Sequence, residues 1–399
     1  MAYRKFKADY LFTGFEMLDS NQVLITDHEG SVQDIVPAEE AGSDIEMLDG
    51  LLSPGFINSH CHLELSHLKG LIPEKKGLVD FVFSVVSQRL RPVEAISGAI
   101  AKAEDEMIAN GIVGAGDICN NLDTYDQKQK NRLLYYNFIE ASGWHPLVAQ
   151  ARFNRSKEFL DSFKKEEADD HPRLSMTPHA PYSVSEELWE LIMPWFANKT
   201  ATIHNQESKS EDQFFESGKG DLLRMYHMMQ IQNDFFRPTY KSSLQSYFSK
   251  MKQAKNVILV HNTFTREEDI QYAIQTANNN RKSGSLYFCI CANANLYIEN
   301  TVPPVELLRK HKCNIVLGTD SLASNHQLDI LAEMKTIASH FPSIPLAELL
   351  KWATLNGAKA LEMDDVAGSF SKRKKPGVLL IKNLDDLHLN EKVFAQRIL

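Results

Sequence analysis

The chain has 399 residues, enough for one α/β domain of roughly 250–300 residues and a smaller second domain. Its hydrophobic content of 43% and charged content of 24% are ordinary for a soluble globular enzyme. The net charge of −9 argues against non-specific nucleic-acid binding, which needs clustered Lys and Arg. No apolar run reaches the length of about 18 residues that a membrane-spanning helix needs.

The N-terminal segment lacks the apolar stretch of a signal peptide. The five cysteines are an odd number in a large chain, which does not suit the disulfide framework of a secreted protein. We therefore expect a cytoplasmic protein.

The two ends of the chain share a β-rich pattern. Short apolar runs divided by Gly and Asp fill residues 9–50, and another β-rich stretch begins at Gly377. Two small β segments at opposite ends of a chain can satisfy the backbone hydrogen bonds of their edge strands by pairing with each other. We therefore expect a small β-sandwich domain built from residues 1–52 and 363–399, and a larger domain over residues 53–362.

Eight apolar runs alternate with helical patterns between these ends. They predict strands near 55–61, 112–117, 133–139, 172–177, 200–205, 256–261, 285–291 and 314–319. Helices are expected at 94–109, 185–197, 265–278, 303–311 and 327–339, the second of them opened by Ser185 as N-cap. This alternation predicts an α/β fold of the (β/α)8 TIM-like barrel type. A doubly wound sheet is the alternative that the pattern alone leaves open.

Residues 208–256 are too many for a simple connection within this pattern. Their Met and Phe side chains predict one or two extra helices. Long insertions on the catalytic side of a barrel also form lids and substrate pockets, and the role of this one is left open.

The segment Pro-Gly-Phe-Ile-Asn-Ser-His-Cys-His-Leu-Glu, residues 54–64, carries two histidines at the end of the first predicted barrel strand. The strand period of two places His60 and His62 on one face, where their imidazoles can chelate a metal such as Zn²⁺. Such a pair is a weak signal alone, because polar residues often end strands.

Ionisable residues also follow four other predicted strands. They are His179, His204 with Glu207, His261 and Asp320. Barrel enzymes keep their chemistry at the carboxyl ends of several strands. Each residue alone could be a capping or core residue, but their joint occurrence favours an active site.

Together these motifs resemble the amidohydrolase superfamily, in its cytosine-deaminase-like branch of mononuclear metal deaminases. The resemblance covers about residues 45–382. The stretches that carry it are 54–62, 178–182, His204 with Glu207, His261, Asn295, 317–325 and 353–360.

The resemblance implies a role for each matching residue. His60, His62, His204 and Asp320 would hold one divalent metal ion, zinc or iron, with water in the open position. Metal-bound hydroxide would attack the carbon that bears the amine. Glu207 would carry a proton to the neighbouring ring nitrogen, Asp320 would take the proton of the water, and His261 would steady the attacking oxygen.

Two departures from related patterns are informative. Binuclear relatives use a carboxylated lysine on the fourth strand, and residues 173–179 contain no lysine, so a single metal is expected. Relatives in this branch usually carry proline and serine where this chain has Cys291 and Ala292. That departure puts in doubt the pocket contacts of the loop expected around Asn295.

The stretch His62-Leu-Glu-Leu-Ser resembles 6-aminodeoxyfutalosine deaminases of the alternative menaquinone route. The resemblance implies that Glu64 accepts hydrogen bonds from ribose hydroxyls and that an arginine pairs with the substrate carboxylate. The sequence does not choose among the candidate arginines. The candidates are Arg89, Arg152 and Arg155, of which we take Arg152 as the expected contact. Further pocket contacts are expected from His179, Asn295 and Ser321.

We therefore expect a metal-dependent hydrolytic deaminase that converts 6-aminodeoxyfutalosine to futalosine and ammonia. Alternatives are deaminases of adenosine, S-adenosylhomocysteine, guanine or cytosine, and a triazine or chlorohydrolase-type hydrolase. A catalytically inactive barrel scaffold is disfavoured, because such proteins usually lose metal ligands. The expected partners are the small-molecule substrate and water, with neither nucleic acid nor membrane, and a homodimer is the commonest closed assembly.

Overall fold

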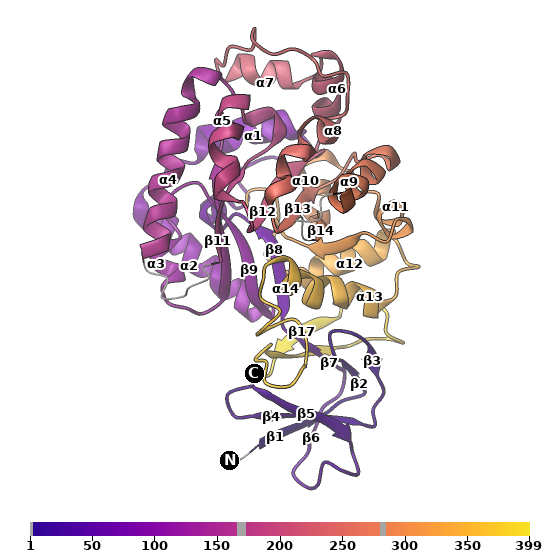
Figure 1. Ribbon diagram of the computed structural model, residues 1–399. Coiled ribbons are helices and arrows are strands. Elements are labelled where there is room, and N and C mark those ends of the chain that lie inside the picture. The colour runs from indigo at the N-terminus through magenta and orange to yellow at the C-terminus, as the bar shows by residue number, and fades with distance from the viewer. Residues whose placement is uncertain (1–2, 166–172, 280–284) are drawn as a thin grey trace.

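The computed structural model describes residues 3–165, 173–279 and 285–399. A large body of helices and strands lies above a small β body in Figure 1, and both chain termini belong to the small body.

The large body contains two four-stranded parallel sheets, with strand orders β11-β10-β9-β8 and β12-β13-β14-β15. Their strands are β8 (Phe56–Cys61), β9 (Ile112–Cys119), β10 (Leu134–Ala141), β11 (Leu174–Pro178), β12 (Thr200–Asn205), β13 (Asn256–His261), β14 (Leu286–Ile290) and β15 (Asn314–Leu317). Each strand begins and ends within two residues of its predicted run, although residue 172 of one run lies outside the described residues.

Hydrogen bonds join the two sheets at both seams. The backbone N–H groups of Thr319 and Asp320 donate to the carbonyl of His60, each at 3.1 Å, which links β15 to β8. His204 N donates to His179 O at 2.9 Å and links β12 to β11. At the first seam a Cβ on Gly318 would lie 2.9 Å from His60 Cβ, so only glycine permits this approach. The predicted barrel is therefore confirmed.

Alternate residues of the barrel strands face different cores. Ile118 of β9 packs with Phe138 and Val260 from other strands. Its neighbour Cys119 packs with the helix residue Met107. This period of two gives the barrel an apolar interior and an outer layer between strands and helices.

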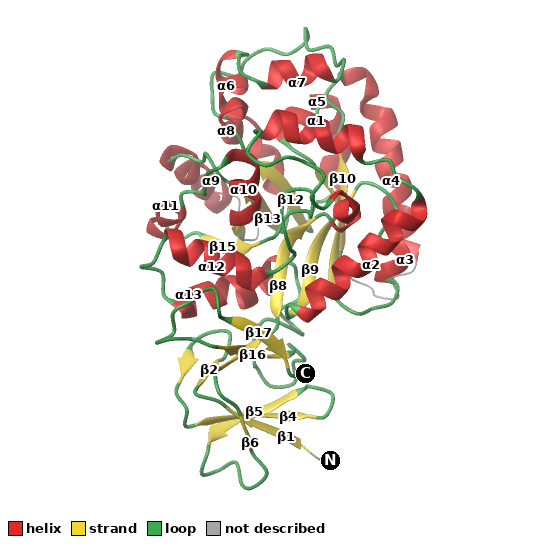
Figure 2. Cartoon of the chain, turned by 180° about the vertical axis from the view of Figure 1, so that it is seen from behind, coloured by secondary structure: helices red, strands yellow, loops and turns green. Residues whose placement is uncertain are grey.

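Helices surround the barrel in Figures 1 and 2. Five match the predicted helices: α2 (Val93–Ala109), α5 (Glu186–Ile192), α9 (Glu267–Asn279), α11 (Val305–Lys310) and α12 (Ile330–His340). Ser185 caps α5, because its side chain accepts from Leu188 N at 3.2 Å. The other α-helices outside the insertion are α1 (Leu78–Gln88), α3 (Tyr125–Lys128), α4 (Ala149–Lys165), α10 (Ala292–Glu299), α13 (Leu346–Lys351) and α14 (Gly357–Ala360). Short 3-10 helices span Leu63–Leu68, Pro146–Val148, Pro181–Ser183 and Met193–Trp195, and a π-helix spans Trp352–Asn356.

The insertion forms α6 (Lys209–Ser217), α7 (Leu222–Met228), α8 (Ser243–Tyr247) and a 3-10 helix at Phe248–Gln253. The prediction of one or two helices was therefore too low. The insertion also does not pack only on itself, because Phe214 and Tyr226 share a core with Trp144 and Tyr182 outside it. In Figure 1 the insertion covers the end of the barrel opposite the small body, which is the end where the strands finish.

The small body is a sandwich of two sheets, ordered β5-β4-β1-β6 and β17-β16-β7-β2-β3. Its strands are β1 (Tyr3–Lys7), β2 (Tyr10–Phe12), β3 (Met17–Leu18), β4 (Gln22–Asp27), β5 (Val32–Pro37), β6 (Glu46–Met47), β7 (Leu51–Pro54), β16 (Val378–Lys382) and β17 (Phe394–Arg397). Phe6 and Leu24 of one sheet share a core with Leu52 and Leu380 of the other. The two chain ends therefore pair as expected, while the limits 1–52, 53–362 and 363–399 stay a prediction.

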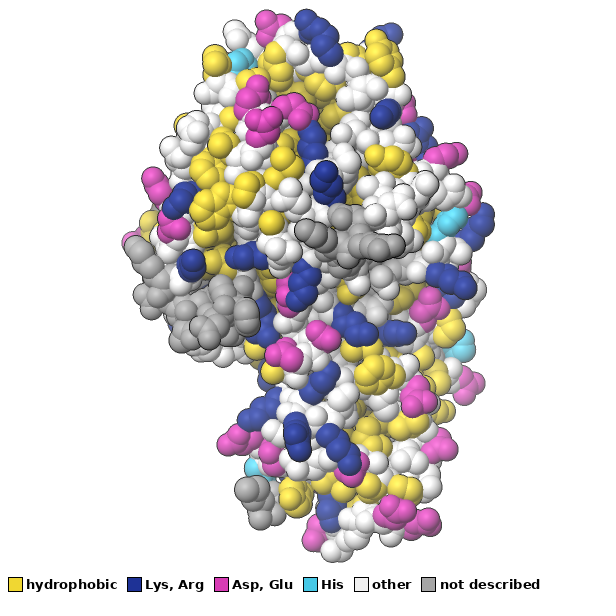
Figure 3. Space-filling view, viewed as in Figure 1, with side chains coloured by type: hydrophobic (Ala, Val, Ile, Leu, Met, Phe, Trp, Pro, Cys, Tyr) yellow, Lys and Arg dark blue, Asp and Glu magenta, His cyan; other side chains and the backbone are white. Residues whose placement is uncertain are grey.

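Acidic and basic side chains are interspersed over the face drawn in Figure 3. Within the described ranges, no helix combines the length and hydrophobicity that crossing a bilayer requires.

Candidate metal centre and active site

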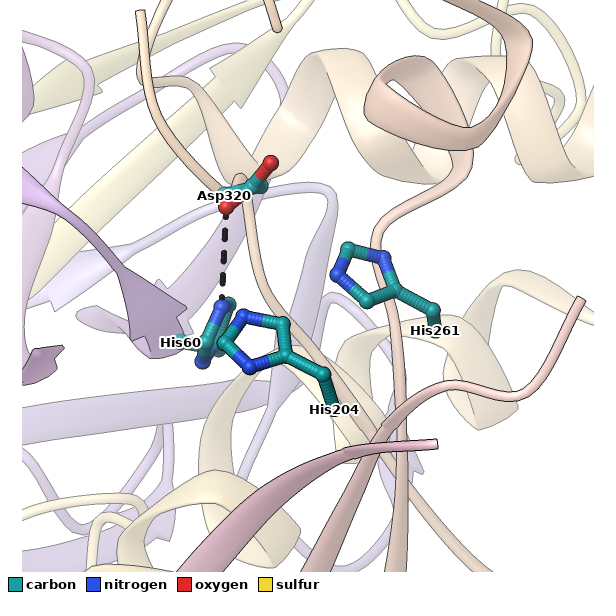
Figure 4. Close-up of side chains that lie close together, drawn as sticks. All are labelled: His60, His204, His261 and Asp320. Atoms are coloured by element: carbon teal, nitrogen blue, oxygen red, sulfur yellow. Dashed lines mark ion pairs between the residues drawn. The ribbon is translucent and has the colours of Figure 1, made fainter. Parts of the chain in front are cut away.

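Three histidines and one aspartate converge where the barrel strands end. His60 Nε2 lies 3.6 Å from Asp320 Oδ1, and His62 Nε2 lies 3.4 Å from the same oxygen. His62 Nε2 is 3.3 Å from His204 Nε2. Figure 4 shows His60, His204 and Asp320 pointing toward one another, with His261 beside them. The structure thus brings together the four residues predicted to hold a metal.

The polar atoms of this cluster fit a metal ion. His60 is 1% exposed, and neither of its ring nitrogens has a hydrogen-bond partner among the described residues. A buried imidazole without partners is costly unless something else binds it. Imidazole and carboxylate are the ligands that zinc and related ions prefer. The donor set therefore suits a divalent ion.

Burial favours the neutral, metal-binding form of two of the cluster's imidazoles. It lowers the pKa of His204 to about 4 and that of His62 well below its usual value. Burial alone would raise the pKa of Asp320, but the surrounding imidazoles hold it well below its ordinary value. Burial therefore favours the neutral, metal-binding forms of His62 and His204.

His261 belongs to the same cluster of possible metal ligands. Its ligand atom and those of His60, His204 and Asp320 all lie within 4.8 Å of one another. His261 and Asp320 have φ angles of 73° and 55°, a region that non-glycine residues seldom adopt. Such backbone strain is typical of functional sites, where surrounding structure holds a side chain in place.

Glu207 stands beside the cluster, with Oε1 3.7 Å from His261 Nε2. It is buried, and burial together with the charge of Asp320 raises its pKa well above the usual value. A carboxyl whose pKa is raised by its surroundings is suited to act as a general acid.

Three of the predicted pocket residues make contacts within the protein. Asn295 Nδ2 donates to His261 Nδ1 at 3.3 Å, but from helix α10 and not from the expected loop. His179 Nδ1 and Ser183 Oγ are hydrogen-bonded at 2.7 Å. Ser321 Oγ accepts from Ala323 N at 3.2 Å and stabilises the turn after Asp320. The substrate-binding roles of these residues stay predictions.

The structure separates the candidate arginines. Arg89 Nη2 lies 3.5 Å from Glu64 Oε1, so this arginine reaches the predicted pocket. Arg152 and Arg155 are exposed on α4. Glu64 is 2% exposed, and burial raises its pKa to about 7. Arg89 is therefore better placed than Arg152 to meet a substrate, and the assignment of Arg152 is untested.

Two polar residues at strand ends were missed in the sequence. Asn120 follows β9, and Glu140 is the next-to-last residue of β10. Glu140 Oε1 lies 3.7 Å from His204 Nδ1, and the ligand atoms of Glu140, His179 and His204 lie within 4.8 Å of one another. The sequence signal that could have identified Glu140 is its position as a charged residue directly after the predicted strand 133–139.

A third missed residue, Ser324, donates its hydroxyl to Asp320 Oδ2. Ser324 lies four residues after Asp320 and orients its carboxylate through this hydrogen bond. The signal in the sequence that could have pointed to Ser324 is its position within residues 317–325, one of the stretches that carry the family resemblance.

Comparisons with known proteins agree with this architecture. The 5'-deoxyadenosine deaminase of Methanothermobacter thermautotrophicus is 24% identical over 402 residues, covering 93% of this chain and 84% of that protein. The aminodeoxyfutalosine deaminase of a Nitratiruptor species is 23% identical over 358 residues, covering 86% and 83%.

Among solved structures, the aminofutalosine deaminase of Helicobacter pylori bound to methylthio-coformycin superposes with a TM-score of 0.78 and 20% identity, over 96% of this chain and 93% of that one. A zinc-bound adenosine deaminase from Xanthomonas campestris gives a TM-score of 0.69 at 19% identity, over 94% and 84%. These structures establish the shared fold. The amidohydrolase family profile matches residues 51–396, most of the chain and the whole candidate site, so the chain belongs to the amidohydrolase family.

Proposed function

We propose that this protein is a metal-dependent hydrolytic deaminase of purine-type amines. The observation that carries the proposal is the buried Glu207, whose pKa is raised, beside a cluster of His60, His62, His204 and Asp320. Relatives named as deaminases of adenosine-type compounds support the reaction class.

His60, His62, His204 and Asp320 would hold one divalent ion. When bound, this ion supplies Lewis acidity and a water molecule whose pKa is brought near neutrality. Either zinc or iron accepts this donor set.

The protein's own groups would move the protons of the reaction. Glu207 would donate to the ring nitrogen beside the carbon under attack, and Asp320 would accept the proton of the attacking water. His261, held by Asn295, would hydrogen-bond to the oxygen that adds to the ring. The proton from Asp320 would pass to the amine, and the carbon–nitrogen bond would break to release ammonia. The proton of the added hydroxyl would return to Glu207 as the carbonyl of the product forms.

The substrate we propose is 6-aminodeoxyfutalosine, which would place the reaction in the alternative menaquinone route. The buried Glu64 would accept from the ribose hydroxyls, and Arg89 beside it offers a partner for a carboxylate. The likeness to an aminodeoxyfutalosine deaminase and to an aminofutalosine deaminase supports this choice.

Ammonia release by metal-loaded protein tests the proposal. The panel would contain 6-aminodeoxyfutalosine, 5'-deoxyadenosine, adenosine, methylthioadenosine, S-adenosylhomocysteine, guanine and cytosine. We expect a kcat/KM of about 10⁴ M⁻¹s⁻¹ or more on the first compound and at least tenfold less on the others. A higher value on another nucleoside would keep the reaction class and replace the substrate. No ammonia from any compound would overturn the proposed function.

A further inference from the structure

Two buried carboxylates at the barrel mouth share one partner, Asn120. The backbone N–H of Asn120 donates to Glu64 Oε2 at 2.9 Å, and its side-chain Nδ2 donates to Glu140 Oε2 at 2.8 Å. Glu64 is 2% exposed and Glu140 is 6% exposed. One residue thus holds a carboxylate from the segment after β8 and another from β10.

The strand alternation directs Glu140 toward the substrate. Tyr136 and Phe138 of β10 contribute to the barrel interior, and Ile139 and Ala141 to the outer layer. Glu140 continues the inward series at the strand end, where its carboxylate approaches His204. It therefore lies inside the barrel mouth next to the proposed metal ligands.

Glu140 has acceptor capacity that the protein does not use. A carboxylate can accept about four hydrogen bonds. Among the described residues Glu140 accepts one with its side chain, from Asn120. His204 Nδ1 is 3.7 Å away and donates instead to His179 O at 2.8 Å. A buried carboxylate with so few donors calls for donors from a ligand.

Glu64 is in a similar position. Besides the bond from Asn120, its carboxylate forms an ion pair with the partly exposed Arg89, at 3.5 Å. A cation placed between the carboxylates would need further ligands, but the Nδ1 atoms of His179 and His204 are already hydrogen-bonded. Neutral donors that reach both carboxylates at once suit the arrangement better.

We propose that Glu64 and Glu140, joined by Asn120, form a pair of acceptors for two neighbouring hydroxyl groups of a sugar. The site therefore selects ribonucleosides over free bases and over nucleosides that lack these hydroxyls. This inference rests on the proposed function, and it adds Glu140 and Asn120 to the specificity-determining residues. Glu140 binds one hydroxyl directly, and Asn120 positions both carboxylates.

Equilibrium binding of a reaction product tests the pair without requiring turnover. Titration calorimetry would compare inosine with 2',3'-dideoxyinosine on zinc-loaded protein. We expect the wild type to bind inosine roughly 10- to 100-fold more tightly, as hydrogen bonds to charged groups allow. Glu140→Gln should reduce this ratio at least fivefold, and Asn120→Ala should reduce it as well. Glu158→Gln, on the exposed face of α4, should leave the ratio unchanged.

Several outcomes would overturn the pair. One is a wild type that binds both ligands equally or binds neither. Another is a Glu140→Gln variant whose affinities for inosine and 2',3'-dideoxyinosine fall by the same factor, because Glu140 would then act only through His204. The zinc content of each variant would confirm that role. Should Glu140→Gln fail to fold, Asn120→Ala provides the same comparison.

The pair and the proposed function can fail separately. If no nucleoside released ammonia but the protein still preferred inosine over 2',3'-dideoxyinosine, the proposed deaminase function would be overturned and the proposed acceptor pair would stand. If adenosine and 2',3'-dideoxyadenosine were deaminated rapidly and at equal rates, the deaminase function would stand and the proposed acceptor pair would be overturned.

Discussion

At the scale of single residues, Glu207 depends on its surroundings for the proton that the proposed mechanism needs. Burial and the nearby Asp320 raise its pKa well above the usual value. We predict that Glu207→Gln keeps its fold and metal but lowers kcat about 10³-fold, because an amide cannot transfer the proton. Steady-state ammonia release and metal analysis would check this, with Glu158→Gln as an exposed control. Turnover within twofold of the wild type would remove Glu207 from the mechanism.

Arg89 and Arg152 differ in position, and this difference makes a second prediction. Arg89 lies beside Glu64, whereas Arg152 is exposed on α4. Arg89→Met should lower kcat/KM for a nucleoside bearing a carboxylate by about tenfold or more relative to adenosine, through loss of a charge-assisted hydrogen bond. Arg152→Met should leave the ratio unchanged. The reverse pattern would restore Arg152 as the carboxylate-binding residue.

At the scale of elements, the eight barrel strands were predictable because each is a short apolar run that the fold buries on both faces. Helix α10 was not. Asn293 and Asn295 have poor helix propensity, and Cys291 provides no side-chain cap. Burial of Ala294 and Ile298 stabilises this helix instead, which is a tertiary effect that local sequence does not report.

Helix α6 is tied to the barrel through a buried carboxyl. Glu211 accepts from Gln206 N at 2.9 Å and from Ser243 Oγ at 2.6 Å, which joins α6 to the end of β12 and to α8. Burial raises its pKa to about 8. The folded state therefore holds a proton that the unfolded state releases near its ordinary pKa of 4.5.

The proton on Glu211 contributes stability that is full below pH 4.5 and is lost as pH rises toward 8. We predict that Glu211→Gln, which has no such proton, becomes more stable relative to the wild type by about 1.4 kcal/mol per pH unit between pH 5 and 8. The difference should level off above pH 8. Urea unfolding from pH 5 to 9 would measure it, and a difference that does not change with pH would contradict the assignment.

A buried ion pair connects β9 and α3. Lys128 Nζ lies 2.5 Å from Asp117 Oδ2, and Asp117 Oδ1 accepts from Leu63 N at 2.8 Å, next to His62. Lys128→Met should destabilise the fold by about 3–5 kcal/mol, because it leaves a buried carboxylate unpaired. Adding Asp117→Asn should recover part of the loss. Urea unfolding would measure both, with the exposed Lys130→Met as control; an equal, small effect of both lysine variants would contradict the prediction.

At the scale of the whole molecule, the candidate ligands come from positions 60, 62, 204 and 320 and meet only because the barrel closes. Strand ends predicted this meeting, since parallel barrel strands finish at one rim. The sequence carries no sign of the positive φ angles of His261 and Asp320. It also does not reveal that Asn120 connects Glu64 to Glu140, because such contacts depend on how neighbouring strands are staggered.

Because the barrel closes between β8 and β15, a metal bound at the site would also hold these two strands together. His60 O accepts from Thr319 N and Asp320 N, so two proposed ligands also lie at the seam between β8 and β15. An ion that binds only the folded chain adds about 4 kcal/mol of stability at a free concentration of 1,000 times its Kd. We predict that a chelator lowers the thermal midpoint by several degrees and that re-added zinc restores it.

His60→Ala provides the decisive control for this effect. This variant should lose the metal, melt below the loaded wild type and show no response to the chelator. His28→Ala, at an exposed turn of the small body, should respond as the wild type does. Differential scanning fluorimetry with metal analysis would measure all three proteins. A chelator response of equal size in His60→Ala would show that the stabilising ion binds elsewhere and that the seam closes without it.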